Sequence, residues 1–291
     1  MTLECAHCLL ERAINQVMLA TEDPETQMNV TAAMLDFLSK SFKMDAVPSH
    51  IGTDRDLLVQ EMTGRDPYAE LKRISNAVAL NILPELKQLL DESPDSESRF
   101  RRATLIAAAA NAIEFDVSGR DFDLEELRGI IENVESDLAI DEIEEFMKLC
   151  LDKREVLYLL DNAGEIVLDM ILISELKNLG LKVIAAVKGG PVLNDATMTD
   201  AKEVGLDSCA DEVIHTGAAA IGVNVERNSM EFLNILNTAE LIVAKGMGNF
   251  ESLTEMESHC PIVHILRTKC PPVAQYIGTG LNQNVILVRK P

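Results

Sequence analysis

Three short segments of the sequence carry residue types that bind metal ions and phosphate groups. Each follows a short apolar run: Asp-Asn-Ala-Gly-Glu at 161–165, Lys-Gly-Gly-Pro-Val-Leu-Asn-Asp at 188–195, and Lys-Gly-Met-Gly-Asn-Phe-Glu at 245–251. A carboxylate beside a carboxamide, at Asp161 and Asn162, suits a hard divalent ion such as Mg²⁺ or Mn²⁺. Asp195 could supply a second carboxylate. The three residues therefore predict a metal site.

The same segments hold features that favour an anionic ligand. Gly164 lets the backbone turn tightly and approach a ligand. A helix that starts near Glu165 would offer free N–H groups at its positive end. Lys245 would add a fixed cation for a phosphoryl group. Together these features predict a phosphate-handling site, although the sequence has neither the P-loop form nor the third glycine of a dinucleotide fingerprint.

Other interpretations of these residues stay open at this point. An Asp-Asn pair before glycine is also ordinary turn and helix-cap chemistry, and Asp195 could be an N-cap. If the site forms, a bound ion would neutralise phosphoryl oxygens and orient or acidify the attacking water. Asp161 as a covalent nucleophile is a competing possibility that the sequence leaves open.

The cysteines allow a second, structural metal site. Cys5-Ala6-His7-Cys8 has zinc-like spacing, and a closed zinc site needs about four ligands. Cys270 is the best remote candidate for a further ligand, with His7 or another histidine completing the set. On a helix Cys5 and Cys8 fall on one face, so ordinary core packing is the alternative.

The surrounding sequence predicts the elements that would position these segments. Residues 1–150 have helical periodicity and almost no strand signal, which predicts a helical part, whereas residues 151–291 alternate apolar runs with helical patterns. Continuous apolar strands are typical of a mostly parallel sheet covered on both faces. In such α/β sheets ligands bind at the carboxyl ends of the strands. The strands are expected at 156–160, 183–187, 212–215, 241–244, 262–266 and 285–288, with helices at 166–179, after Asp195 and at 225–236.

Composition excludes several kinds of partner. The formal net charge is −22, which argues against nucleic acid and against anionic membrane surfaces. No apolar run approaches the roughly 18 residues of a membrane span, and the N-terminus does not resemble a signal peptide. We therefore expect a cytoplasmic protein. A small anionic substrate remains possible if local cations offset the acidic charge. The oligomeric state is not fixed by the sequence.

Taken together, the three segments resemble the signatures of the metal-dependent damage-control phosphatases, long catalogued as domain of unknown function 89. Asp66-Pro67-Tyr68 with Lys72, and Asn111, resemble the helical signatures of that family. The early Cys-x-x-Cys and late Lys-Cys look like its short, mainly archaeal branch. One departure lies after Asn111, where Glu114 stands in place of the family's usual Asp.

The resemblance implies a helical N-terminal domain and a C-terminal Rossmann-like α/β/α sandwich. It implies a divalent ion (Mg, Mn, Co or Ni) held by Asp161, Asn162 and Asp195, with Lys245 on the phosphate. It also implies hydrolysis of small phosphorylated metabolites, including sugar phosphates. Further candidates for substrate contact are Asp66, Lys72, Asn76, Asn111, Gly164, Glu165 and Asn249.

We therefore predict a metal-dependent phosphomonoester hydrolase. One alternative is a transferase that binds a nucleotide or S-adenosylmethionine on a Rossmann-like sheet, although the glycine-rich turn such a site uses is missing after the first strand of the α/β part. Another is a non-catalytic protein that binds a metal or a metabolite.

Overall fold

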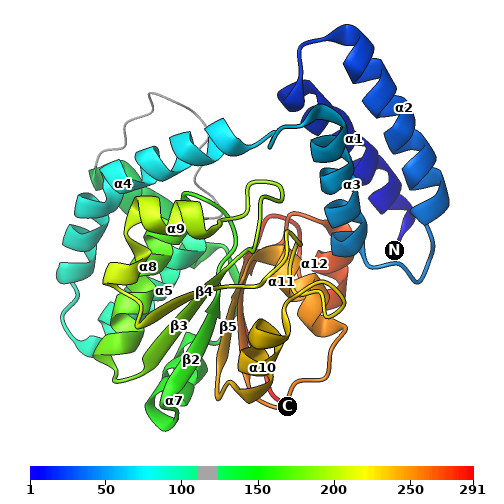
Figure 1. Ribbon diagram of the computed structural model, residues 1–291. Coiled ribbons are helices and arrows are strands. Elements are labelled where there is room, and N and C mark those ends of the chain that lie inside the picture. The colour runs from blue at the N-terminus through cyan, green and yellow to red at the C-terminus, as the bar shows by residue number, and fades with distance from the viewer. Residues whose placement is uncertain (111–123) are drawn as a thin grey trace.

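A seven-stranded sheet forms the centre of the part of the chain that the structure describes (Figure 1). The structure is a computed structural model, and it describes residues 1–110 and 124–291. The strand order is β1-β7-β6-β5-β2-β3-β4. Strands β2 to β6 run parallel to one another, whereas β7 is antiparallel to β6 and parallel to β1. The strands are β1 (Leu138–Asp141), β2 (Glu155–Leu159), β3 (Lys182–Val187), β4 (Glu212–His215), β5 (Ile242–Lys245), β6 (Ile262–Arg267) and β7 (Asn284–Arg289).

Helices cover both faces of the sheet. Alternate side chains of β2 point to opposite faces: Tyr158 belongs to the core cluster shared with α4 to α9, and Leu159 to the cluster shared with α10 and α11. The predicted three-layer α/β/α architecture is thereby confirmed. These helices are α4 (Ala69–Asp91), α5 (Ser96–Ala109), α6 (Leu124–Ser136), α7 (Ile143–Asp152), α8 (Glu165–Asn178), α9 (Met198–Val204), α10 (Met230–Thr238), α11 (Gly246–Thr254) and α12 (Pro271–Ile277), with a 3₁₀ turn at Leu206–Ser208.

The first three helices form a separate small bundle at one end of the sheet (Figure 1). They are α1 (Leu3–Ala20), α2 (Pro24–Ser41) and α3 (Pro48–Thr63), and they have an apolar core of their own around Val17, Met34 and Val59. Asp23 caps α2 by accepting the Thr26 N–H. No helix in the described ranges is both long and apolar enough to cross a membrane.

One strand lies where the sequence predicted only helices. β1 falls within residues 1–150 and joins the sheet beside β7. Its four residues, Leu-Ala-Ile-Asp, are too short a run to reveal a strand by alternation. The hydrophobic core also crosses residue 150, since Val78 and Phe146 belong to the same cluster as Tyr158. The helices before residue 150 thus divide into the bundle α1–α3 and a layer, α4–α7, that covers the sheet.

Candidate active site

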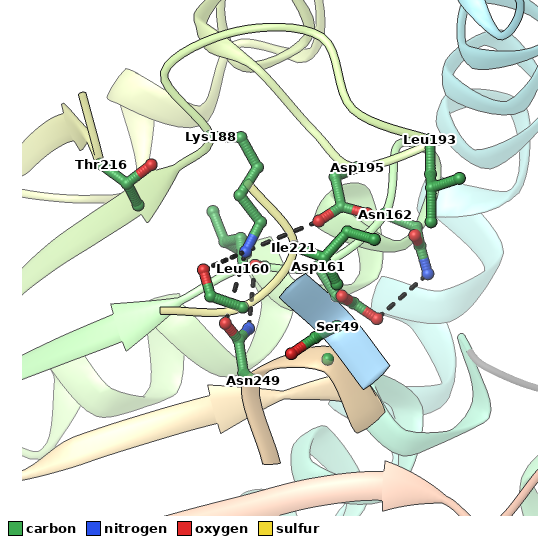
Figure 2. Close-up of polar contacts among 12 residues, drawn as sticks. Ser49, Leu160, Asp161, Asn162, Lys188, Leu193, Asp195, Thr216, Ile221 and Asn249 are labelled. Atoms are coloured by element: carbon green, nitrogen blue, oxygen red, sulfur yellow. Dashed lines mark hydrogen bonds and ion pairs between the residues drawn. The ribbon is translucent and has the colours of Figure 1, made fainter. Parts of the chain in front are cut away.

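The ends of β2 and β3 bring three of the predicted site residues together. The Ala196 N–H donates to the Asp161 carbonyl at 2.8 Å, and a β-bridge pairs Asn162 with Asp195. β2 lies between β3 and β5 in the sheet. After β2 the chain adds β3 on one side of it, and later adds β5 on its other side. Such a switch point is where open α/β sheets bind ligands. Asp161, Asn162 and Asp195 lie there as a group (Figure 2).

Two glycines shape the backbone around Asp161. Gly246 begins α11 with φ +76°, and a Cβ at this position would stand 1.9 Å from Asp161 Oδ2. A glycine is therefore required for the carboxylate to reach the positive end of α11. Gly164 has φ +77° at the start of α8, and its N–H donates to Asn76 Oδ1 at 2.8 Å. The predicted role of Gly164 as a tight turn before a helix matches this geometry.

Burial and mutual repulsion make the two carboxylates unusually basic. Burial, followed by the charges of Asp195 and Glu165, raises the pKa of Asp161 well above its ordinary value. Burial raises the pKa of Asp195 to about 6, although Lys188 lowers it. Asp195 Oδ2 has no hydrogen-bond partner among the described residues. The site therefore holds excess negative potential that a cation would relieve.

Lys188 supplies a buried cation beside these carboxylates. Its Nζ lies 3.5 Å from Asp195 Oδ2, 3.3 Å from Asn249 Oδ1 and 3.5 Å from the Gly222 carbonyl (Figure 2). Lys188 as a whole is 2% exposed. All three contacts are longer than those of a tight charged hydrogen bond. Our sequence reasoning did not single out Lys188 as a site residue, although it follows a strand and precedes a glycine, as Lys245 does.

Lys245 lies on the other side of the sheet. Its Nζ donates to Asp169 Oδ1 and to the Ala107 carbonyl, both at 2.7 Å. The Tyr158 hydroxyl also donates to Asp169 Oδ1 at 2.7 Å. The charge of Lys245 lowers the pKa of Asp161. The ammonium group is held by α5 and α8, and within the described residues no hydrogen bond or ion pair joins it to Asp161 or Asp195. Its predicted contact with phosphate stays a prediction.

Asn249, also predicted to contact substrate, lies beneath Lys188. It is 1% exposed, and its Nδ2 donates to the Lys245 carbonyl at 2.8 Å and the Leu160 carbonyl at 3.3 Å. Its Oδ1 accepts from Lys188. Asn249 thus joins the ends of β2 and β5 to the Lys188 ammonium. Glu165 stands closer to the carboxylates, where its Oε1 accepts from Asn162 Nδ2 at 2.7 Å.

The residues predicted from the helical signatures have different positions relative to the site. Asn76 reaches the site through Gly164 and also donates to Asp200 and Glu203. Asp66 and Lys72 form an ion pair with each other at 2.9 Å, and Lys72 is buried. Their predicted contact with substrate stays a prediction. Asn111 and Glu114 lie outside the residues that the structure describes.

Helix α3 approaches the site from the N-terminal bundle, which sequence reasoning missed. Thr53 Oγ1 accepts from the Ile221 N–H at 2.9 Å, and the buried Asp56 accepts from the Leu193 N–H at 3.2 Å. Leu193 has φ +46°, a left-handed conformation that is rare for leucine. These contacts join residues more than a hundred positions apart, so no local pattern could have revealed them.

The predicted structural zinc site is not formed as a cluster in the described residues. Cys5 is buried, Cys8 is exposed and Cys270 is half-buried, and all three are free thiols. No three His, Cys, Asp or Glu side chains within 1–110 and 124–291 are placed to hold a metal ion together. The charges of Glu251, Cys5 and Cys8 help to raise the pKa of Cys270, after burial. Zinc binding at these cysteines stays a prediction.

The group at the strand ends has a donor set suited to a hard divalent cation. It offers two carboxylates and one carboxamide, at Asp161, Asp195 and Asn162. The pKa of both carboxylates is raised, and Asp195 Oδ2 accepts no hydrogen bond among the described residues and has only the 3.5 Å ion pair with Lys188. A site built around a cation would show these features without the cation's charge. The residues present therefore fit the metal that their types predicted.

Comparison with known proteins agrees with this geometry. The model of the damage-control phosphatase ARMT1-like domain matches residues 1–285. The chain belongs to this family. It is 35% identical to a damage-control phosphatase of Archaeoglobus fulgidus over 98% of this chain and 97% of the relative. It is 32% identical to a damage-control phosphatase of Pyrococcus horikoshii, over 94% of this chain and 92% of the relative.

The family also has a solved structure that matches the whole fold. A crystal structure of a protein of the DUF89 family from Pyrococcus horikoshii superposes with a TM-score of 0.90 at 31% identity, covering 100% of this chain and 99% of that one. The resemblance that the three sequence segments indicated is thereby confirmed. Membership of the damage-control phosphatases supports a phosphatase activity for this chain.

Proposed function

We propose that this protein is a metal-dependent phosphatase that hydrolyses small phosphorylated metabolites. The observation that carries the proposal is the group at the strand ends, where Asp161, Asn162 and Asp195 lie beside the buried cation Lys188. Two acidic groups that repel each other need a cation, and a buried ammonium with long contacts can attract a dianion. Both requirements are met by a divalent ion and a phosphate monoester.

Asp161, Asn162 and Asp195 would hold the divalent ion, which supplies positive charge to phosphoryl oxygens and lowers the pKa of water. Lys188 would bind a phosphoryl oxygen, since its present partners are two neutral oxygens and one carboxylate oxygen, all at 3.3–3.5 Å. α11 begins at Gly246 against the Asp161 carboxylate, and α8 begins just after Gly164, in the same segment as Asp161. The positive ends of both helices would favour the charge that spreads over the transferring group. Asp161 remains a candidate for the attacking nucleophile as well as for a metal ligand.

This arrangement explains how a chain of net charge −22 could accept an anion. The positive potential would be local, provided by the ion, Lys188 and two helix ends in a buried setting where charges are weakly screened. Polyanionic partners such as nucleic acids would instead meet the acidic surface. We therefore expect substrates small enough to enter with a single phosphoryl group.

The decisive experiment measures phosphate release from p-nitrophenyl phosphate and from a panel of sugar phosphates with Mg²⁺, Mn²⁺, Co²⁺ or Ni²⁺. We expect activity that EDTA abolishes and that added metal restores. Asp161→Ala should reduce kcat/KM at least about a thousandfold, because both metal binding and charge placement would be lost.

Asp207→Asn is a matched control, because this aspartate is exposed in the 3₁₀ turn and lies outside the three segments. It should keep the wild-type rate. If Asp161→Ala kept wild-type metal-dependent activity, the assignment of the site would be wrong. Activity that persists in EDTA would instead remove the metal from the proposal.

A further inference from the structure

The start of α3 contacts a loop that borders the proposed phosphate site. Thr53 joins the two, since its hydroxyl donates to the Ser49 carbonyl and accepts from the Ile221 N–H, each at 2.9 Å. The next residue, Gly222, accepts from Lys188 through its carbonyl. Gly52 is in equally close contact, since a Cβ there would stand 2.9 Å from the Ile221 side chain. The start of α3 is thus fixed against the loop that also contacts the buried cation.

Ser49 places an unused hydroxyl in this region. Its side chain is 4% exposed, and Oγ has no hydrogen-bond partner among the described residues. Figure 2 draws Ser49 in the same part of the view as Asp161 and Asn249, and the contacts of Thr53 place the start of α3 against the loop whose Gly222 carbonyl accepts from Lys188. A buried hydroxyl without a partner is unfavourable, because it has lost its hydrogen bonds to water and gained none in the protein. Such a group calls for an explanation, and a bound ligand that accepts its proton provides one.

The start of α3 also lacks the features that usually satisfy a helix N-terminus. Its N-cap is Val47, which makes no side-chain cap, and its first turn has no acidic residue. In contrast, α2 and α5 are capped by Asp23 and Asp95. Pro48 has no N–H, so Ser49 supplies the first free backbone donor of the helix. An anion at this position would complete the helix end as a capping carboxylate does.

We propose that Ser49 is a substrate-binding residue that donates its hydroxyl and backbone N–H to a phosphoryl oxygen. The assignment rests on the proposed phosphatase function and adds a residue from the N-terminal bundle to the site. This role would account for the contacts of α3 with two loops of the α/β part, because the helix would place a neutral hydrogen-bond donor opposite the charged residues of the site. Substrate binding would then depend on how the bundle sits against the sheet.

The experiment compares Ser49→Ala with wild type in the metal-supplemented protein. We measure KM and kcat for p-nitrophenyl phosphate, the affinity for inorganic phosphate by calorimetric titration, and the melting temperature. The variant should bind phosphate about tenfold more weakly and raise KM about tenfold, while kcat changes less than about threefold. The melting temperature should stay equal or rise, because the change removes a buried polar group without a partner.

Ser39→Ala serves as the control, because this serine is exposed on α2 and its hydroxyl donates to the Asp36 carbonyl of its own helix. It should match wild type in every measurement. If wild type is an active phosphatase and Ser49→Ala keeps its KM and phosphate affinity, the role of Ser49 is wrong while the proposed function stands. A fall in melting temperature with unchanged phosphate affinity would show a structural role instead. If wild type neither releases nor binds phosphate, both proposals fail.

Discussion

Lys188 comes directly after β3, and Lys245 is the last residue of β5, so both lie near the carboxyl ends of parallel strands. Both lysines are buried, but their environments differ. Lys245 has no exposed surface, and its Nζ makes two contacts of 2.7 Å, to the Asp169 carboxylate and the Ala107 carbonyl. Lys188 is also buried, but its three contacts lie at 3.3–3.5 Å. The first lysine is fully engaged by protein groups. The second can exchange its long contacts for a ligand.

Strand alternation explains why similar local sequences place the lysines on opposite faces. Lys245 is two positions after Val243, which belongs to the core shared with α8. Lys188 is two positions after Ala186, which belongs to the core on the other face. Because side chains alternate along a strand, each lysine continues the face of its predecessor. A lysine at the end of a strand can therefore face either side of the sheet, and its position in the alternation of the strand decides which.

The largest expected effect is on the stability of a Lys245→Met variant. Removing this cation would leave the buried Asp169 carboxylate without its ion pair. Among the described residues that donate to it, the Tyr158 hydroxyl would remain. Breaking one side of a buried ion pair costs about 3–5 kcal/mol. Urea denaturation should show a loss of that size in the free energy of unfolding. Lys40→Met, at an exposed ion pair with Asp36, should cost less than about 1 kcal/mol.

The Lys245→Met loss should shrink as the pH falls. Burial already raises the pKa of Asp169, and Lys245 is the largest influence that lowers it, so the variant should raise this pKa further. A carboxyl group with a raised pKa in the folded state binds a proton more tightly there than when unfolded, so its stability contribution improves as pH falls. We expect a smaller difference from wild type near pH 5 than near pH 8. A pH-independent difference would show that Asp169 is not the cause.

The second prediction concerns the activity of Lys188→Met. If Lys188 binds the phosphoryl group, its loss should lower kcat/KM about 10²–10³-fold in the metal-supplemented protein. The free energy of unfolding should fall by less than in Lys245→Met, because the contacts of Lys188 are long. Steady-state phosphate release measures the first effect and urea denaturation the second.

Lys182→Met is the control, because Lys182 is the exposed first residue of β3, the strand that Lys188 follows. It should retain full activity. The opposite pattern would overturn the comparison. If Lys245→Met folded normally and lost activity while Lys188→Met stayed active, Lys245 would be the phosphate ligand that the family resemblance implies.

The sequence predicted the sheet and the grouping of Asp161, Asn162 and Asp195 because their signals are local. Apolar runs that end in Asp161 and before Lys188 identify strand ends, and parallel strands bring such ends together. The sequence did not distinguish the environments of Lys188 and Lys245, because the alternation of side chains along a strand places a residue only once the two faces of the sheet are known. It could not show Ser49 or Asp56 near the site, because their contacts depend on how the bundle meets the sheet. β1 was missed because four residues carry little periodicity.

The smallest expected effect is that of Asn249→Leu, which removes the side chain that joins the two lysines. Its Nδ2 donates to the Lys245 carbonyl and its Oδ1 accepts from Lys188. Leucine has a similar size but would leave the Leu160 and Lys245 carbonyls without this donor, which should cost about 1–3 kcal/mol of stability. Activity should fall about tenfold, since Lys188 stays but loses a partner that orients it.

The pH profile of phosphate release, together with the KM and kcat of this variant, distinguishes positioning from direct substrate contact. As a positioning residue, Asn249 should affect kcat/KM less than Lys188 does, and the double variant with Lys188→Met should be no less active than Lys188→Met alone. Additive losses in the double variant would mean that Asn249 contacts the substrate itself, as the sequence first indicated. In that case the long contacts of Lys188 would not explain the difference between Lys188 and Lys245.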